Sequence, residues 1–183
     1  MKNERGFTLI ELLVVMVVVL IMASLGASAM RHYWFVRSVK SASQQVTAQL
    51  RQLQSQADSV SHPVVYGAWF LPNQSNSSEW GTLIYDPTIT NVADRCELGS
   101  DAKVLPTEVR VVDAAFTDTT TLTSACKTEL TGAGVANASS AKTLFFYARG
   151  NSTGGELTLA REGVGRERTI EIAALTGRVV EEE

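Results

Sequence analysis

The fold of this chain is decided by an apolar stretch near its start, where residues 6–30 read GFTLIELLVVMVVVLIMASLGASAM. Residues 12–30, 19 in all, carry no charge, and as a helix they would rise about 28 Å, just enough to cross the hydrocarbon core of a bilayer. Lys2 and Arg5 precede the stretch, and basic residues before a spanning helix favour a cytoplasmic N-terminus. We therefore expect one membrane-spanning helix, followed by a domain outside the cytoplasm.

A secretory signal peptide is the competing interpretation of the same stretch. Ala27, Ser28 and Ala29 form a small-residue pattern of the kind that signal peptidase cleaves. However, the apolar run is longer than the roughly 7–15 residues of a signal peptide. Glu11 also lies in the apolar region, where a carboxylate costs roughly 2.5–3.5 kcal/mol at the centre of a spanning helix. A retained helix with a functional carboxylate fits both observations better.

The start of the stretch resembles the leader junction of type IV pilins and type II secretion pseudopilins, in particular over residues 6–15, GFTLIELLVV. The resemblance implies that prepilin peptidase cleaves between Gly6 and Phe7 and that the new amine of Phe7 is N-methylated. It also implies a single-pass protein of the bacterial inner membrane with a periplasmic C-terminal domain. Such a chain joins other pilin or pseudopilin subunits in a pilus or pseudopilus.

Glu11 is then interpreted as a subunit-docking group. A lone carboxylate in lipid is unstable until a cation neutralises it, and the free N-terminal amine of a neighbouring subunit is such a cation. The alternative is a carboxylate that reaches back to the cytoplasmic interface of the membrane.

A second apolar pattern follows the membrane stretch and predicts that the helix continues to about residue 59. Its members recur at spacings of three and four residues, as on one face of a helix: Val39, Ala42, Val46, Leu50, Leu53, Ala57 and Val60. His62 and Pro63 should end the helix, because a residue before proline disfavours helical backbone. A coiled-coil seam between chains is the alternative, but no ordered charge pairs flank the pattern.

After Pro63 the sequence changes to short β-rich runs separated by turns rich in Gly, Asn, Ser and Thr. The runs cover residues 64–71, 81–85, 109–112, 143–148, 157–160, 169–173 and 178–180. We expect residues 117–140 to form a long connection. The domain organisation is then a leader at 1–6, a membrane or filament-core helix at 7–30, the amphipathic half of the helix at 31–61 and a β-rich domain at 62–183.

The C-terminal sequence resembles the GspH/FimT family of minor pilins, over residues 143–159, 165–172 and 175–179. The resemblance implies the type IV pilin-like fold, an α+β fold in which the long N-terminal helix packs on an antiparallel β-sheet domain. That expectation agrees with the helical and strand periodicities.

Cys96 and Cys126 are the two cysteines, and both fall in the middle of a domain that we place outside the cytoplasm. We predict a disulfide between them, because this compartment is oxidising. Two free buried thiols are the alternative.

DNA binding is suggested by a four-residue pattern, Gly165-Arg166-Glu167-Arg168. It matches a motif with which FimT-type minor pilins bind DNA during natural transformation, and the resemblance implies this role for Arg166 and Arg168. Residues 141–180 are locally basic, with six basic and four acidic side chains, although the whole chain has a net charge of −3. Any polyanion binding must therefore be local.

The position of the two arginines follows from strand parity. Arg166 and Arg168 share their register with Ile170 and Ile172, which should face the core, and both arginines cannot be buried there. We expect the strand to begin near Thr169, so that residues 163–168 form an exposed loop that contacts phosphates without reading bases. A solvated turn without a ligand is the alternative, because neighbouring glutamates oppose a polyanion.

Catalysis is not indicated by any motif, and we expect neither an enzyme nor a cofactor or metal. His32 and His62 are the two histidines, and neither has a cysteine or carboxylate at metal-ligand spacing. The sequence favours a FimT-type minor pilin that supports pilus assembly and binds DNA. The alternatives are a GspH-type pseudopilin of a type II secretion system without DNA binding, and a secreted carbohydrate-binding β-domain that would use Trp80.

Overall fold

The computed structural model describes residues 8–60, 63–74, 77–99, 102–106, 108–117, 120–161, 165 and 167–182. Within these ranges the side chains of residues 25–29, 31–32, 92–93 and 120–123 are not described. The chain divides into two compact units, Met1–Arg37 and Ser38–Glu183. Gly6, Phe7 and Arg166, three of the predicted site residues, lie outside the described part.

Helix α1 covers Leu9–Ser59, which confirms the helix expected over residues 7–59 with a start two residues later. It begins after Thr8, whose side-chain oxygen accepts a hydrogen bond from the backbone N–H of Glu11 (3.4 Å). At its other end, the Ser59 hydroxyl donates to the carbonyl of Gln56 (2.7 Å). Pro63 follows closely, and proline restricts the residue before it to extended backbone.

The first sheet contains β1 (Val65–Phe70), β2 (Glu79–Tyr85), β3 (Cys96–Leu98), β4 (Lys103–Val104) and β6 (Lys142–Phe146). Its strand order is β3-β2-β1-β6, and β4 pairs with the other end of β2. All pairings are antiparallel, with Val65 opposite Tyr85 and Gly67 opposite Phe145. Gly81 of β2 leaves room for a tryptophan, because a Cβ there would lie 2.6 Å from Trp69 Nε1.

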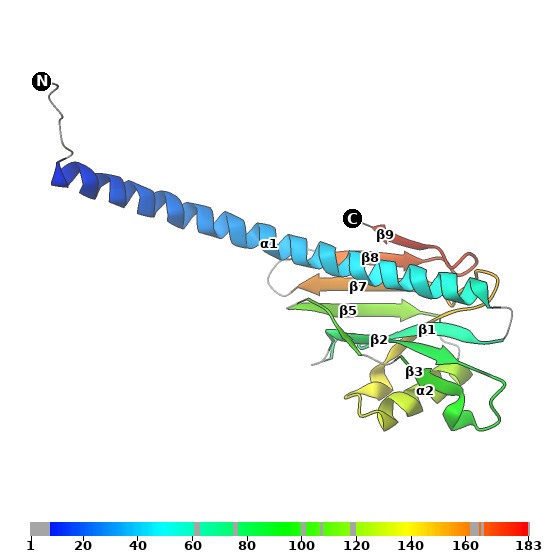
Figure 1. Cartoon of the computed structure of the whole chain (residues 1–183). Coiled ribbons are helices and arrows are strands. Elements are labelled where there is room, and N and C mark those ends of the chain that lie inside the picture. Colours follow the sequence, from blue (N-terminus) through cyan, green and yellow to red (C-terminus); the bar gives the residue numbers. More distant parts are fainter. Residues whose placement is uncertain are drawn as a thin grey trace, which may run out of the picture. The chain divides into compact units, whose positions relative to one another are not determined.

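The second sheet contains β5 (Val109–Phe116), β7 (Gly155–Arg161), β8 (Glu167–Ile172) and β9 (Val179–Glu182), in the order β5-β7-β8-β9. Its pairings are also antiparallel, and the register of β5 shifts between Val111 and Asp113. Figure 1 shows β5, β7, β8 and β9 side by side, next to the part of α1 that belongs to the same unit. An α+β fold with a long helix on antiparallel sheets is therefore confirmed.

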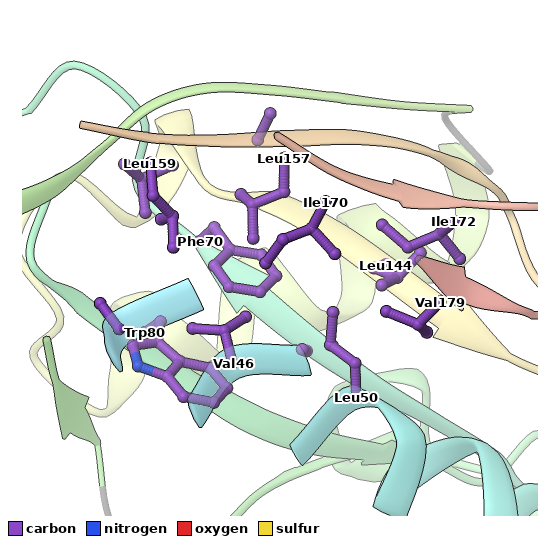
Figure 2. Packing of buried hydrophobic residues seen from close by; sticks show 14 of the residues in the cluster. Val46, Leu50, Phe70, Trp80, Leu144, Leu157, Leu159, Ile170, Ile172 and Val179 are labelled. Carbon is purple, nitrogen blue, oxygen red and sulfur yellow. The ribbon is translucent and has the colours of Figure 1, made fainter. Parts of the chain in front are cut away.

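The main core lies between the second half of α1 and both sheets. Figure 2 shows Val46 and Leu50 of α1 near Phe70 and Leu144 of the first sheet and Ile170 of the second. The helical pattern in the sequence predicted this packing face correctly, since six of its members are buried: Val39, Ala42, Val46, Leu50, Leu53 and Ala57. The seventh, Val60, is half-buried and follows the end of the helix. The predicted packing of this helix on its own domain is confirmed.

Trp80 belongs to this core, whereas the carbohydrate-binding alternative requires it to be exposed. Its side chain has no exposed surface and stacks on Phe70, with ring centroids 5.7 Å apart. Strand alternation does not predict this burial, because Trp80 shares its face of β2 with the half-buried Thr82 and Ile84. Trp80 is buried because the main core covers that end of the strand. A carbohydrate-binding role for Trp80 loses its basis.

The expected long connection over residues 117–140 is also wrong. Helix α2 covers Thr120–Gly132, and a short 3-10 helix, η2, covers Ala138–Ser140. A second 3-10 helix, η1, covers Val92–Arg95. Threonine-rich sequence has a weak intrinsic helix preference, but Ala125, Cys126 and Leu130 of α2 are buried in a second apolar cluster beside the first sheet. Packing against this cluster stabilises a helix that local propensity does not predict.

Candidate functional site

The start of α1 places Glu11 in the first turn of a capped helix. Glu11 donates its backbone N–H toward Thr8, whose carbonyl oxygen lies 3.1 Å away, and Leu12 donates to the same carbonyl (3.2 Å). Thr8 and Glu11 thus occupy the N-cap and N3 positions of the pattern Ser/Thr-x-x-Glu. A carboxylate in the first turn also interacts favourably with the positive end of the helix dipole. Glu11 therefore has a local role in the helix as well as its predicted role in docking.

The first turns of α1 present apolar side chains on every face of the helix. Between Leu9 and Met22 all thirteen large apolar side chains are exposed, from Val18 at 46% to Leu9 at 83%. Glu11 is the one charged residue in this range and is exposed as well. A helix that is apolar all round is stable only when other apolar groups cover it. Within the described part of the chain, none of the helices reaches the length and hydropathy that a membrane crossing requires.

Arg168 lies in strand β8, and the expected exposed loop over residues 163–168 is wrong at its end. Strand β8 begins at Glu167, and Arg168 is opposite Leu159 of β7. Its side chain is 15% exposed and its guanidinium nitrogen lies 3.7 Å from the carboxylate of Glu181 on β9, which is 20% exposed. Arg168 therefore lies on the same face of the strand as Ile170, the position that we expected an arginine to avoid. The ion pair makes this position tolerable, because a charge near the core needs a partner.

Arg161 forms a second charged contact, which the sequence analysis did not predict. Its guanidinium group pairs with Glu108 and donates a hydrogen bond to the Ser38 hydroxyl (3.0 Å). Arg161 of β7 follows Leu157 and Leu159 at a spacing of two, so parity alone places it on the inner face of the sheet. The contact fastens the second sheet to α1 at Ser38, where the second compact unit begins.

The disulfide between Cys96 and Cys126 is present, as predicted. The two Cα atoms lie 5.1 Å apart, and both side chains are buried. The bond joins β3 at the edge of the first sheet to α2 and crosses the second apolar cluster. The bond is structural, because it links α2 to β3 covalently where no strand pairing joins them.

Two hollows lie on the second unit, the first lined mainly by polar side chains and the second equally by polar and apolar ones. One, of about 320 Å³, lies between α1 and the first sheet, against Gln49, Gln52, Leu53, Gln56, Thr82, Gly99 and Lys103. The other, of about 420 Å³, lies beside the disulfide, against Asp94, Cys96, Glu97, Leu98, Glu129 and Ala133. Within the described ranges, no three His, Cys, Asp or Glu side chains are placed to hold a metal ion.

Comparison with known families agrees with this architecture. The N-terminal part, residues 1–27, matches the family model described as "Prokaryotic N-terminal methylation motif". Residues 42–176, about three-quarters of the chain, match the model described as "Type II transport protein GspH".

The chain belongs to the GspH family. This GspH-family chain is therefore a minor pilin or pseudopilin, which confirms the resemblance found in its leader and C-terminal sequences. A similar solved structure is the minor pseudopilin EpsH from the type 2 secretion system of Vibrio cholerae, with 9% sequence identity and a TM-score of 0.49. That match covers 79% of this chain and 96% of EpsH. No curated protein sequence matches the GspH-family chain.

Proposed function

We propose that this GspH-family chain is a filament subunit that is first anchored in the bacterial inner membrane through residues 7–30. Cleavage between Gly6 and Phe7 by prepilin peptidase and N-methylation of Phe7 belong to the same proposal, and the methylation motif over residues 1–27 supports them. The observation that carries the proposal is the exposed apolar surface of α1 between Leu9 and Met22. Each such side chain contributes about 1.5–3 kcal/mol when it moves from water to apolar surroundings. A bilayer covers this apolar surface of α1 first, and neighbouring subunits cover it in the filament.

Glu11 gives the assembly its register in this proposal. It is the only charged residue between Leu9 and Met30, so a neighbouring subunit can pair a cation with it at one axial position only. The methylated amine of a neighbour's Phe7 is such a cation. A charge pair inside an apolar environment is strongly position-specific, because either charge left alone is costly.

Of the two possible assemblies, the type II secretion pseudopilus has the better support. The family model that covers most of the chain is described as a type II transport protein. The ion pair between Arg168 and Glu181 also engages half of the arginine motif within the domain itself. We therefore propose a pseudopilin that acts with other pseudopilins in a periplasmic filament.

DNA binding in a type IV pilus is the second candidate. Gly165 is exposed and has a positive φ of 59°, a backbone conformation that glycine adopts without strain. A guanidinium group that follows an exposed glycine in the sequence is a candidate for contact with a phosphate. In this candidate Arg166 contributes more than Arg168, whose guanidinium already has a carboxylate partner.

The two candidates are separated by asking which filament contains the chain. The full chain, with a small C-terminal tag, is expressed in one strain that assembles only type IV pili and in another that assembles only a type II secretion pseudopilus. The proposed function predicts tagged chain in purified pseudopili and in the membrane of both strains. Recovery in sheared pili alone would support the second candidate, and recovery in neither filament would contradict both.

A further inference from the structure

Four residues at the end of the first compact unit form one face of α1. Met30, Tyr33, Trp34 and Arg37 stand at positions i, i+3, i+4 and i+7 of the helix, which bring their side chains to the same side. All four are exposed, and Tyr33 and Trp34 keep about three-fifths of their surface. Two large aromatic side chains next to each other in solvent are unusual in a soluble domain and point to an interaction surface.

This face follows directly after the apolar run, at the place where a spanning helix leaves the hydrocarbon core. Tyr and Trp gather at that depth in membrane proteins, because their rings are apolar while the hydroxyl and the indole N–H remain hydrated. Met30 is the last residue of the uncharged run, and Tyr33 and Trp34 lie within the next turn. The order of side chains along the helix therefore follows the polarity gradient of a membrane surface.

The positive charge of α1 around this face favours anionic phospholipids. The whole chain is acidic, with a net charge of −3, yet there is no Asp or Glu between Glu11 and Asp58. The basic residues in that interval are Arg31, Arg37, Lys40 and Arg51. Arg37 lies on the aromatic face itself, where its guanidinium can reach a headgroup phosphate while the rings occupy the interface. A surface of this sign complements anionic phospholipids.

We infer that Met30, Tyr33, Trp34 and Arg37 form an interfacial anchor that binds anionic phospholipid headgroups on the outer side of the inner membrane. The inference rests on the proposed membrane anchoring of residues 7–30. The anchor fixes the depth of the helix in the bilayer and holds the subunit at the membrane surface until it is drawn into a filament. A neighbouring subunit's helix is the competing occupant of this face.

The chain contains its own reporter for the test. Trp69 and Trp80 are buried in the domain, whereas Trp34 is 58% exposed. Quenching of tryptophan fluorescence by lipid-borne nitroxides therefore reports on Trp34. The full chain is reconstituted in phosphatidylcholine vesicles with and without phosphatidylglycerol, and the nitroxide is placed either near the headgroup or at the end of the acyl chain. Flotation after alkaline extraction measures membrane insertion independently.

The anchor predicts stronger quenching by the shallow nitroxide than by the deep one, and loss of that difference in Trp34→Phe. Energy transfer from Trp34 should be stronger to dansyl-labelled phosphatidylglycerol than to dansyl-labelled phosphatidylcholine. One basic side chain at the membrane surface should enrich anionic lipid beside it about fivefold. Arg37→Gln should remove most of this preference. Lys142→Gln, which removes an exposed positive charge from β6, is the matched control and should leave the preference unchanged.

Two results would overturn the inference, and they differ in what they say about the proposed function. If the chain floats with vesicles but Trp34 is quenched by neither nitroxide, or shows no lipid preference, the face is reserved for another subunit and membrane anchoring stands. If the chain does not float with vesicles at all, membrane anchoring and the interfacial anchor fail together.

Discussion

At the scale of single residues, a charge-neutral substitution separates the position of Glu11 in the helix cap from its proposed role in subunit docking. Gln is accepted at N3 of a capping box, so Glu11→Gln keeps the cap with Thr8 but removes the charge. We expect the variant to insert in the membrane normally and to enter filaments at least about tenfold less, because a neighbour's cation then lacks its carboxylate. Quantitative immunoblots of membranes and purified filaments measure both quantities.

Thr8→Ala is the matched control for Glu11. It removes the N-cap, which costs helices about 1 kcal/mol, and leaves the carboxylate in place. Normal filament entry of Thr8→Ala together with loss in Glu11→Gln identifies the charge as the docking determinant. Equal entry of wild type and Glu11→Gln would reduce Glu11 to a capping residue.

The ion pair of Arg168 and Glu181 leads to a prediction about stability. Removing one partner of a buried pair costs roughly 3–5 kcal/mol and of an exposed pair less than about 1 kcal/mol, so Arg168→Ala should cost about 2 kcal/mol in this half-buried setting. The double variant Arg168→Leu/Glu181→Leu should recover most of the loss, because it leaves no charge without a partner. Urea unfolding measures the free energies, and an unchanged midpoint in Arg168→Ala would show that the pair contributes nothing.

Because Arg168 is paired with Glu181, the two arginines should contribute unequally to DNA binding in the second candidate function. Each phosphate neutralised on duplex DNA contributes about −0.9 to the slope of log affinity against log salt. If the second candidate holds, Arg166→Ala should flatten the slope by about that amount, while Arg168→Ala changes it little. Salt titrations with random duplexes, and Lys142→Ala as charge control, measure the slopes. Absence of binding at low salt would eliminate the candidate.

At the scale of elements, the disulfide should stabilise α2 and β3 more than the rest of the fold. Cys96 and Cys126 are 30 positions apart, and a bridge closing a loop of that size is worth roughly 3–4 kcal/mol in the chain-entropy model. The double variant Cys96→Ser/Cys126→Ser should lose that much stability, and its amides in α2 should exchange with solvent first. Hydrogen exchange measures the protection of the α2 amides. Equal protection of α2 in wild type and double variant would contradict the prediction.

The elements also show how much of the fold the sequence could predict. The second half of α1 was predictable because Val39, Val46 and Leu50 repeat with the period of a helix that is buried on one side. The leader motif was recognisable by its resemblance to the pilin leader junction. Glu11 was recognisable because a carboxylate in an apolar run is rare. Helix α2 was not predictable, because its buried residues are few and acquire their partners from η1, β3 and the disulfide.

The partner of Arg168 was the part of the candidate site that sequence could not predict. Strand parity puts Arg168 on the face of Ile170, and the predicted loop was wrong because the sequence does not show that a partner lies there. The partner is Glu181 of β9, which is opposite Ile170, two positions along β8 from Arg168. That register depends on the β8–β9 turn, which closes when Gly177 donates its backbone N–H to the Ala173 carbonyl (2.8 Å). Without knowledge of this register, the sequence predicts a loop at an arginine next to the core.

At the scale of the whole molecule, the two compact units have different requirements. Unit Ser38–Glu183 contains a closed core between α1 and two sheets. The described part of unit Met1–Arg37 is mainly helix with exposed apolar side chains between Leu9 and Met22 and no core of its own, and such a helix needs other apolar groups to cover it. The described part of the molecule is therefore a folded domain preceded by a helical segment whose apolar surface is uncovered.

The central claim, that the chain is processed and then built into a filament, is tested most directly by the intact mass of the chain recovered from purified filaments. We expect a single species that begins at N-methylated Phe7 and retains the Cys96–Cys126 bond. A chain that still begins at Met1 would contradict the claim, as would one that begins at Met30 after cleavage by signal peptidase, or filaments that contain no such chain at all.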